Sequence, residues 1–244
     1  MQNIFLSIIM ISLVVSPKKD IETYKPIVVL ELFTSQGCSS CPSADDLLYN
    51  VRKESKDVDV NIIALSYHVD YWNYIGWKDP FSKKEFSEKQ RLYSKKFNSS
   101  TIYTPQIVVN GLEHFVGSKS DVMKSKIDTY INKYSKNKVV ISNLEKRDKL
   151  ISFNYNVLGE KTNKKLRAVL VINDRITSVK NGENRNRTLK NSNIVVQENY
   201  LNIENKKANV SIPEIVSKTD KLTLMLIVEN NELDIVGGSQ INVN

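Results

Sequence analysis

Blocks of apolar residues along the first half of the chain predict strands and helices that alternate. Near-continuous apolar runs at Ile27–Thr34 and Val60–Tyr67 predict two strands buried on both faces, as in a parallel βαβ unit. We also expect strands at Gln106–Val109 and about Leu112–Val116, and helices at Ser40–Ser55, about Phe81–Phe97 and about Ser118–Tyr134. Residues 24–135 then follow the order βαβαββα, with an aromatic loop and a helix inserted.

The pattern changes after Tyr134, where short β-rich runs are separated by Asn, Lys and Gly. These runs are Val139–Leu144, Leu150–Val157, Lys165–Ile172, Ile194–Leu201, Ala208–Ile212, Leu222–Val228 and Asp234–Val243. About seven short strands over roughly 105 residues are typical of an antiparallel β-sandwich. We therefore expect a second, all-β sandwich-like domain over residues 138–244.

The chain has two cysteines, Cys38 and Cys41, which lie between the first expected strand and the first expected helix. A strand that leads into C-x-x-C at the start of a helix is how the thioredoxin fold presents a redox dithiol. Unpaired N–H groups at a helix N-terminus lower the pKa of a thiol. The resulting thiolate is the nucleophile of thiol–disulfide exchange.

A second mark of that fold lies downstream. Thr104-Pro105 stands before the third expected strand, and Asn110-Gly111 follows that strand. This arrangement is typical of a cis-proline strand that ends in a hairpin. The sequence thus predicts an α/β thioredoxin-like domain, βαβαββα with a cis-proline, followed by an all-β sandwich-like domain.

Strand direction brings the candidate residues to one edge of the sheet. The second strand is expected to run parallel to the first, so the residues that follow it lie at the same edge as the cysteines. The third strand runs antiparallel to the first, so its first residues lie there as well. The residues expected at this edge are Cys38, Cys41, His68, Asp70, Tyr71, Trp72, Thr104 and Pro105.

Catalytic roles are assigned to four of these residues. Cys38 would attack a disulfide, and Cys41 would resolve the mixed disulfide. Pro105 would hold the substrate strand beside Cys38. His68 would orient or protonate the leaving thiol, or tune the Cys38 thiolate. Substrate binding is assigned to Thr104, Asp70, Tyr71 and Trp72.

Each assignment has a structural alternative. The cysteine pair could be a stable disulfide that holds the loop together. His68 could be hydrogen-bonded to loop backbone, and Asp70 could cap a turn. The aromatic residues could pack the loop onto the core instead of lining a groove.

A metal site is a further alternative, because Cys38, Cys41, His68 and His114 make up a Cys₂His₂ set that suits zinc or copper. A two-residue hairpin after the third strand would place His114 opposite Ile107, away from the cysteines. This register argues against a closed zinc site, and we expect neither a metal nor a cofactor.

The charge pattern and the N-terminus indicate an exported protein that does not bind nucleic acid. The net charge is +8, but the lysines are scattered and form no basic stripe with interleaved aromatic residues. Ile4–Val15 is almost wholly apolar, too short to span a bilayer but typical of a signal peptide. We expect residues 1–20 to be a signal peptide or an N-terminal apolar anchor. A periplasmic or secreted protein with one cysteine pair fits an oxidising compartment.

The loop Lys180–Leu189 in the second half carries a carboxylate and two arginines, Arg185 and Arg187. It could be an ordered hairpin loop, a contact to the first domain or an anionic ligand site. We expect the arginines to stack on the aromatic loop at Tyr71–Trp77.

Several stretches resemble a bacterial, mostly exported family known as domain-of-unknown-function family 1223. They are Glu31–Asp45, His68–Trp72, Gly76–Phe81, Tyr103–Gln106, Gly182–Asn184 and Arg187–Leu189. The resemblance covers most of the chain after residue 26. It implies a thioredoxin-like domain followed by a β-rich domain, and it names no activity.

The sequence as a whole predicts an exported thiol–disulfide oxidoreductase that uses Cys38-Ser-Ser-Cys41. Its partner would be a protein or a small molecule that carries a disulfide or a dithiol. The alternatives are a non-enzymatic exported binding module with a structural disulfide, and a copper- or zinc-binding protein. Oligomeric state, substrate and electron partner are not predicted.

Overall fold

The computed structural model describes residues 22–54 and 61–243. The expected signal segment, residues 1–20, lies outside this range. The helices are α1 (Pro42–Glu54), α2 (Lys84–Lys96) and α3 (Ser120–Tyr130), with a 3-10 turn, η2 (Asn73–Ile75). The strands are β1 (Ile27–Thr34), β2 (Asn61–His68), β3 (Gln106–Val109), β4 (Glu113–Val116), β5 (Lys138–Arg147), β6 (Leu150–Leu158), β7 (Lys164–Ser178), β8 (Thr188–Leu201), β9 (Lys207–Ser211), β10 (Leu222–Asn230) and β11 (Ile235–Val243). None of the helices in the described ranges has the length and apolar character that crossing a bilayer requires.

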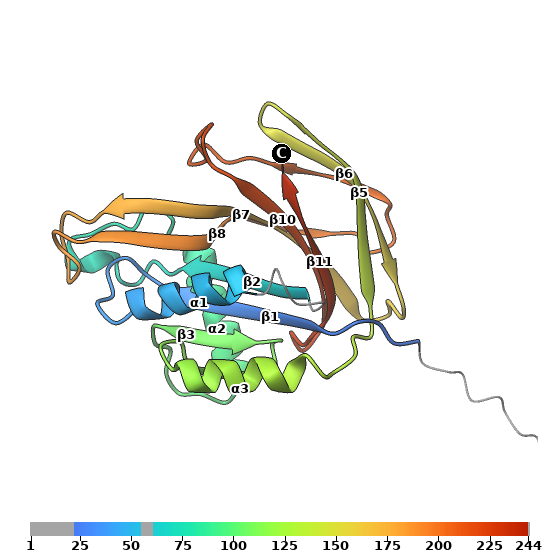
Figure 1. Cartoon of the computed structure of the whole chain (residues 1–244), viewed down its shortest axis with the longest axis horizontal. Helices are drawn as coiled ribbons and strands as arrows, with labels where there is room; N and C mark the ends of the chain where they lie inside the picture. The colour runs from blue at the N-terminus through green and yellow to red at the C-terminus, as the bar shows by residue number, and fades with distance from the viewer. Residues whose placement is uncertain (1–21, 55–60, 244) are drawn as a thin grey trace, which may run out of the picture.

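Eight strands form one mixed sheet, in the order β11-β10-β7-β8-β2-β1-β3-β4, and β5, β6 and β9 form a second sheet (Figure 1). Within the large sheet, β1 runs parallel to β2 and antiparallel to β3, as expected. The two halves of the chain meet where β2 pairs with β8, with Ser66 opposite Ile194. The hydroxyl of Ser66 also donates a hydrogen bond to the carbonyl of Ser192, at 2.7 Å.

The expected fold class, an α/β thioredoxin-like βαβαββα domain followed by an all-β sandwich-like domain, is therefore wrong. Strands make up 46% of the structure and helices 18%. The strands of the first half do not form a sheet of their own, because β7, β8, β10 and β11 continue the same sheet. The division of the chain into folding units at residues 24–135 and 138–244 stays a prediction.

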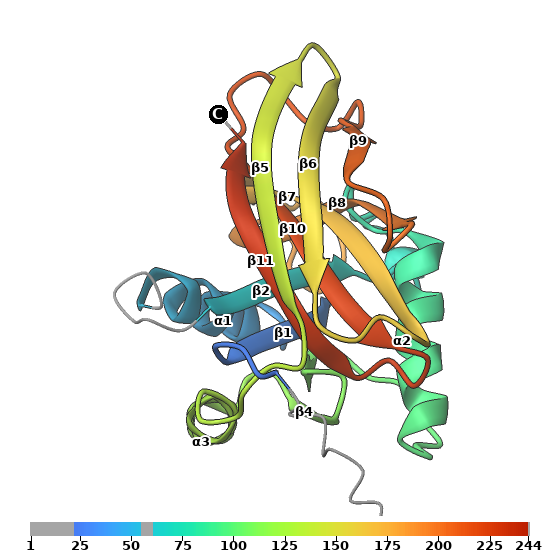
Figure 2. The ribbon, with the colours of Figure 1, turned by 90° about the vertical axis from the view of Figure 1, so that its right-hand side faces the viewer.

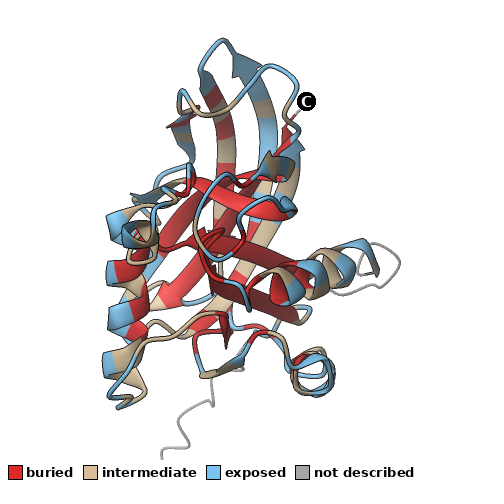
Figure 3. Ribbon diagram, turned by 90° about the vertical axis from the view of Figure 1, so that its left-hand side faces the viewer, coloured by how far each residue is buried: buried red, intermediate tan, exposed pale blue. Residues whose placement is uncertain are grey.

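Three apolar cores hold these layers together. On one side of β1 and β2 lie α1 and α3, and on the other side lies α2 (Figure 2). The three-stranded sheet packs across β7, β8 and β10 and closes the third core. Figure 3 shows the buried strands at the centre, while the outer faces of the helices and the end of the β5–β6 hairpin are exposed.

The large sheet curls until its last strand contacts the start of β2. Asn61 donates a hydrogen bond to the carbonyl of Gly238 at 3.3 Å, and Gln240 donates one to the carbonyl of Ile62 at 3.0 Å. A Cβ atom on Gly238 would lie 2.7 Å from the side chain of Ile27. It would also lie 2.9 Å from the carbonyl oxygen of Leu226 on β10, so glycine lets β11 lie close to β10 and to Ile27.

The β3–β4 hairpin differs from the expectation in its loop. Val109 pairs with Glu113, so the loop has three residues, and His114 lies opposite Val108 instead of Ile107. Asn110 binds β1, because its Oδ1 atom accepts from the amide of Val29 at 2.6 Å. The Thr104–Pro105 peptide before β3 is cis, as expected.

Candidate functional site

Cys38 and Cys41 form a disulfide in the turn between β1 and α1. The carbonyl of Cys41 accepts hydrogen bonds from the amides of Ala44 and Asp45, at 2.9 and 3.1 Å, so Cys41 caps the helix. The disulfide therefore lies at the positive end of the helix dipole. Both cysteines are buried, with exposed fractions of 1% for Cys38 and 0% for Cys41.

One hydroxyl group contacts the sulfur of Cys38. Ser40 Oγ lies 3.4 Å from Cys38 Sγ. A disulfide sulfur carries no hydrogen, so the hydroxyl of Ser40 is the donor. In the reduced protein the same hydroxyl could donate to a Cys38 thiolate, and a hydrogen bond to the charged form favours ionisation.

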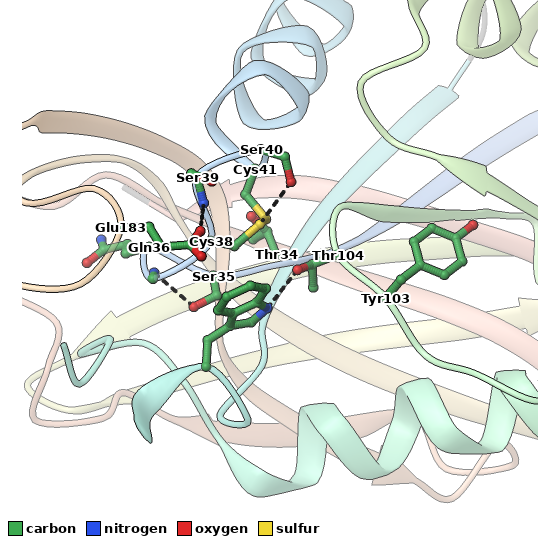
Figure 4. The surroundings of a disulfide bond; sticks show 12 residues. Thr34, Ser35, Gln36, Cys38, Ser39, Ser40, Cys41, Tyr103, Thr104 and Glu183 are labelled. Carbon is green, nitrogen blue, oxygen red and sulfur yellow. Dashed lines mark hydrogen bonds between the residues drawn. A yellow bond between two sulfur atoms is a disulfide. The ribbon is translucent and has the colours of Figure 1, made fainter. Parts of the chain in front are cut away.

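The loop between β7 and β8 covers this turn from outside. Asn184 donates hydrogen bonds to the carbonyls of Gln36 and Cys38, at 2.9 and 2.8 Å. Glu183 accepts from the amide of Ser39 at 2.9 Å, as Figure 4 shows. The loop is thus bound to the backbone of the turn that holds the disulfide, and we name residues 182–184 the cover loop.

Thr104 lies beside the disulfide on another side (Figure 4). The indole of Trp72 donates a hydrogen bond to Thr104 Oγ1 at 2.8 Å. A Cβ atom on Gly117 would lie 3.1 Å from the Cβ of Ala44 and 3.3 Å from the Cβ of Pro105. Pro105 is thus placed next to the first turn of α1, and the structure brings Thr104, Pro105 and Trp72 to the disulfide region.

A buried polar cluster lies behind the turn. Asp79 Oδ2 accepts hydrogen bonds from the amide of Gln36 at 2.8 Å and pairs with His68 Nδ1 at 2.7 Å. Gln36 is held further by the amide side chain of Asn191 and by the indole of Trp77, at 2.9 and 3.2 Å. The ring of His68 also contacts the ring of Phe81, and its Nε2 atom has no hydrogen-bond partner within the described residues.

Neighbouring charges and hydrogen bonds set the protonation states of His68 and Asp79. Burial alone would lower the pKa of His68, but the charge of Asp79, its hydrogen bond and the charge of Asp45 outweigh burial, so the pKa is raised. Burial would raise the pKa of Asp79, yet the His68 charge and the hydrogen bonds that Asp79 accepts keep it below its usual range. Both shifts favour the charged forms, an ionised carboxylate beside an imidazolium.

Asp45 is a third titratable group in the cluster. Its exposed fraction is 3%, and its Oδ2 atom accepts from the hydroxyl of Thr34 at 3.0 Å. Its Oδ1 atom has no partner of good geometry in the described part of the chain, although Asn191 of β8 acts on the carboxyl group. Burial raises the pKa of Asp45 to about 7, and the charge of His68 opposes this rise only in part.

Two of the predicted binding residues, Asp70 and Tyr71, are hydrogen-bonded to α2, and Tyr71 also interacts with Thr104. Asp70 accepts from the hydroxyl of Ser87 on α2, and its amide donates to the same hydroxyl at 3.1 Å. The hydroxyl of Tyr71 donates to Gln90 of α2 at 3.1 Å. Both side chains thus anchor the loop to α2. Tyr74, by contrast, is 83% exposed.

The cover loop contacts the aromatic segment, but through other residues than expected. A Cβ atom on Gly182 would lie 3.2 Å from the side chain of Ile75 and 3.3 Å from that of Trp77. Arg185 and Arg187 are exposed, and Arg187 donates to Asn184 Oδ1 at 2.6 Å instead of stacking on a ring. Arg187 therefore orients the amide that holds the turn.

Sequence reasoning missed Asp45, Asp79, Asn184 and Ser40. Asp45 follows Cys41 by four residues, a spacing that places both on one helix face, and this was the available signal. Asp79 and Asn184 lie in stretches that carry the family resemblance, but a carboxylate before proline and an asparagine in a polar loop look like ordinary turn residues. Asp79 bonds residues of the first half, whereas Asn184 reaches the turn only because β8 lies beside β2.

The described residues contain no group of three or more His, Cys, Asp and Glu side chains placed to hold a metal ion. His114 contacts Tyr103 and Gln106, at 3.0 and 3.3 Å. It lies with Phe97 and Tyr103 rather than with the cysteines.

Comparison with known proteins identifies the family but no activity. The family model described as "Protein of unknown function (DUF1223)" matches residues 29–229. A crystal structure of a protein from Agrobacterium tumefaciens is 26% identical, with a TM-score of 0.65, over 91% of this chain and 96% of that chain. A beta-glucosidase from Kluyveromyces marxianus, 14% identical, aligns with 46% of this chain and 14% of its own at a TM-score of 0.21, which carries no argument. Among curated proteins no match is found.

Proposed function

We propose that this chain, which belongs to the DUF1223 family of proteins of unknown function, exchanges thiols and disulfides through Cys38 and Cys41. The observation that carries the proposal is the position of the disulfide at the N-terminus of α1, with the Ser40 hydroxyl on the Cys38 sulfur. A helix N-terminus and a hydroxyl donor both stabilise a thiolate.

In the oxidising direction, a substrate thiolate attacks Cys38 Sγ. The Cys38–Cys41 bond breaks, and the electron pair leaves on the sulfur of Cys41. A second substrate thiolate then attacks the substrate sulfur of the mixed disulfide and releases Cys38 as a thiolate. The substrate is oxidised by two electrons, and the protein disulfide is reduced by the same two.

Support for Cys38 as the attacked sulfur comes from its neighbours. The sulfur of Cys38 contacts the hydroxyl of Ser40, while Cys41 lies at the helix cap. The substrate would carry a disulfide or a dithiol, on a protein or a small molecule. The exported setting that the apolar segment Ile4–Val15 predicts would suit such a pair, since disulfides persist in oxidising compartments.

Trapping experiments test this assignment. In Cys41→Ser the resolving sulfur is missing, so glutathione disulfide should leave a stable mixed disulfide on Cys38, visible by mass spectrometry of the intact protein. In Cys38→Ser the remaining Cys41 should react at least about tenfold more slowly, because the helix cap shields it. Equal trapping in the two variants would contradict the assignment.

A second candidate function is favoured by the burial of both cysteines, at 1% and 0% exposure. A buried disulfide can serve to hold the turn between β1 and α1 in a binding protein without redox activity. In that case the cover loop would not need to move, and glutathione would leave the disulfide intact.

A further inference from the structure

Asp45 is a buried carboxylic acid that takes no part in the exchange steps of the proposed function. It lies in the first part of α1, four residues after Cys41, so the two side chains share one face of the helix. Helical side chains lean toward the N-terminus of their helix, which directs the carboxyl group over the turn that begins at Cys41.

Thr34 supplies a second link between Asp45 and the disulfide. Its hydroxyl donates to Asp45 Oδ2 at 3.0 Å, and Thr34 itself lies beside the disulfide (Figure 4). Thr34 is also paired with His68 across the parallel strands β1 and β2. The carboxyl group, the imidazole and the disulfide thus surround one residue at the end of β1.

Two buried atoms in this space, Asp45 Oδ1 and His68 Nε2, have no hydrogen-bond partner of good geometry among the described residues, although Asn191 acts on the Asp45 carboxyl group. A buried polar atom without a partner carries a free-energy cost, so its retention calls for a role. Both atoms can hold or release a proton, and the other ring nitrogen of His68 is fixed by Asp79.

We propose that Asp45 exchanges a proton with the sulfur of Cys41 whenever the disulfide opens or closes, and that His68, fixed by Asp79, helps to stabilise the carboxylate form of Asp45. The proposal rests on the proposed function and adds a residue to it. When a thiolate attacks Cys38, the sulfur–sulfur bond breaks toward Cys41, and the neutral carboxyl of Asp45 gives its proton to the Cys41 thiolate. When the disulfide forms again, the Asp45 carboxylate takes the proton from the Cys41 thiol as that sulfur attacks Cys38.

The electrostatics agree with this direction of transfer. Asp45 has its pKa raised to about 7 by burial, so its acid form is present at neutral pH and remains more acidic than an ordinary thiol. The titratable groups that act on Asp45 are His68 of β2, which lowers its pKa, and Asp79 of the loop after β2, which raises it. From β8 the contributing residue is the neutral Asn191.

The chain offers a matched control for the test. Asp46 is the next residue of the same helix, has the same side chain and is exposed. We compare Asp45→Asn and Asp46→Asn with the wild type and measure the rate of disulfide reduction by a water-soluble phosphine between pH 5 and pH 9. The ratio of variant to wild-type rate cancels the titration of the phosphine itself.

We expect the Asp45→Asn rate to fall about tenfold or more below pH 6, since general acid catalysis contributes at least that much. The deficit should disappear above pH 8 with a midpoint near 7, where wild-type Asp45 has lost its proton. Asp46→Asn should keep a ratio of about one throughout. A ratio for Asp45→Asn that does not change with pH would overturn the proposal, because a packing defect alone has no such midpoint.

Carbon-detected NMR of the wild-type carboxyl groups keeps the proposal testable even if Asp45→Asn does not fold. In the oxidised protein Asp45 should titrate in one step near pH 7. In the reduced protein Asp45 and Cys41 should titrate as a coupled pair in two steps, since each charge disfavours the other. A midpoint near 4, or identical curves in both redox states, would overturn the proposal. Either result leaves the redox potential of the pair, and hence the proposed function, as a separate question.

Discussion

At the scale of single residues, Ser40 is the side chain whose chemistry is most closely tied to Cys38. Its hydroxyl lies 3.4 Å from Cys38 Sγ, whereas Ser39 contributes its backbone amide to Glu183. Of the two adjacent serines, Ser40 contacts the sulfur through its side chain, whereas Ser39 contacts Glu183 through its backbone amide.

We predict that Ser40→Ala slows the alkylation of reduced Cys38 by iodoacetamide at pH 6 by up to about tenfold, because a hydrogen bond to a charged group is lost and the thiolate fraction falls. Ser39→Ala is the matched control and should keep the wild-type rate. If both variants react at the wild-type rate, the Ser40 hydroxyl does not stabilise the thiolate.

Asp45 also predicts a pH dependence of stability. Its pKa rises from an ordinary value of 3.8 to about 7 in the folded state. As pH increases through this interval, the unfolded chain loses the proton before the folded chain does, so folding is increasingly penalised and the full cost applies above about pH 7. A difference of about 3 in pKa corresponds to about 4 kcal/mol.

Asp45→Asn should therefore raise the free energy of unfolding by about 2 to 4 kcal/mol at pH 8 and give no gain at pH 4. Urea denaturation of the oxidised protein at the two pH values measures this difference. Asp46→Asn should follow the wild type at both. A gain of equal size at pH 4 and pH 8 would mean that the carboxyl group does not carry a shifted pKa.

At the scale of elements, the cover loop is held to the turn by Asn184. Its side chain is buried and donates to two carbonyls, those of Gln36 and Cys38. The loop belongs to the β7–β8 connection, so the turn that holds the disulfide is bound by a residue 146 and 148 positions away in the chain.

We predict that Asn184→Ala destabilises the protein by about 1 to 3 kcal/mol, because two buried carbonyls lose their donor. The disulfide should also react faster with dithiothreitol, since the loop is released. Arg185→Ala, an exposed neighbour in the same loop, should change neither quantity. Unchanged reduction kinetics in Asn184→Ala would mean that the cover loop does not limit access.

The positions of the elements were largely predictable from the sequence. Local patterns decide them: the apolar run at Ile27–Thr34 and the run at Gln106–Val109 have the bounds that the structure gives to β1 and β3. The loop residues Asp70 and Tyr71 were harder to place, because an aspartate or a tyrosine at the edge of a sheet can face a site or a helix. Their orientation follows from the packing of α2, to which both side chains are hydrogen-bonded.

At the scale of the whole molecule, a buried ionic network joins strands from both halves of the chain. Arg167 of β7 is fully buried and lies 2.7 Å from Glu31 of β1 and 3.3 Å from Glu229 of β10. Glu198 of β8 bridges Arg167 and Lys89 of α2, at 3.4 and 3.0 Å. The network thus joins charges from both halves of the chain, since Arg167 and Glu198 of the second half pair with Glu31 and Lys89 of the first.

Arg167→Met should destabilise the protein by about 3 to 5 kcal/mol, because Glu31 and Glu229 would remain buried without their counter-charge. The exposed pair Arg147–Glu145 provides the comparison, and Arg147→Met should cost less than about 1 kcal/mol. Tryptophan fluorescence and far-UV circular dichroism should report one common transition. Two separate transitions would instead favour the division at residues 24–135 and 138–244.

The assembly of the halves was not predictable for a physical reason. Seven short β-rich runs bury their apolar faces equally well in a sandwich or as an extension of a neighbouring sheet. Which arrangement forms depends on whether the edge of β2 is free to pair with another strand. The residues that pair there, Ser66 of β2 and Ile194 of β8, have no sequence pattern that predicts the pairing. The disulfide, Thr104 and Pro105 were placed by the directions of β1 and β3, which the sequence indicated. The bonds of Asn191 to Gln36 and of Asn184 to the turn depend on the unpredicted pairing of β2 with β8.

The reduction potential of the Cys38–Cys41 pair tests the central claim most directly. The full chain is equilibrated with glutathione buffers of defined ratio, and the fraction oxidised is measured by alkylation and mass spectrometry. We predict a potential between about −120 and −270 mV, the range of pairs that exchange with substrates. A value below about −300 mV, at which the disulfide resists glutathione, would contradict the account and leave the pair as a structural link between β1 and α1.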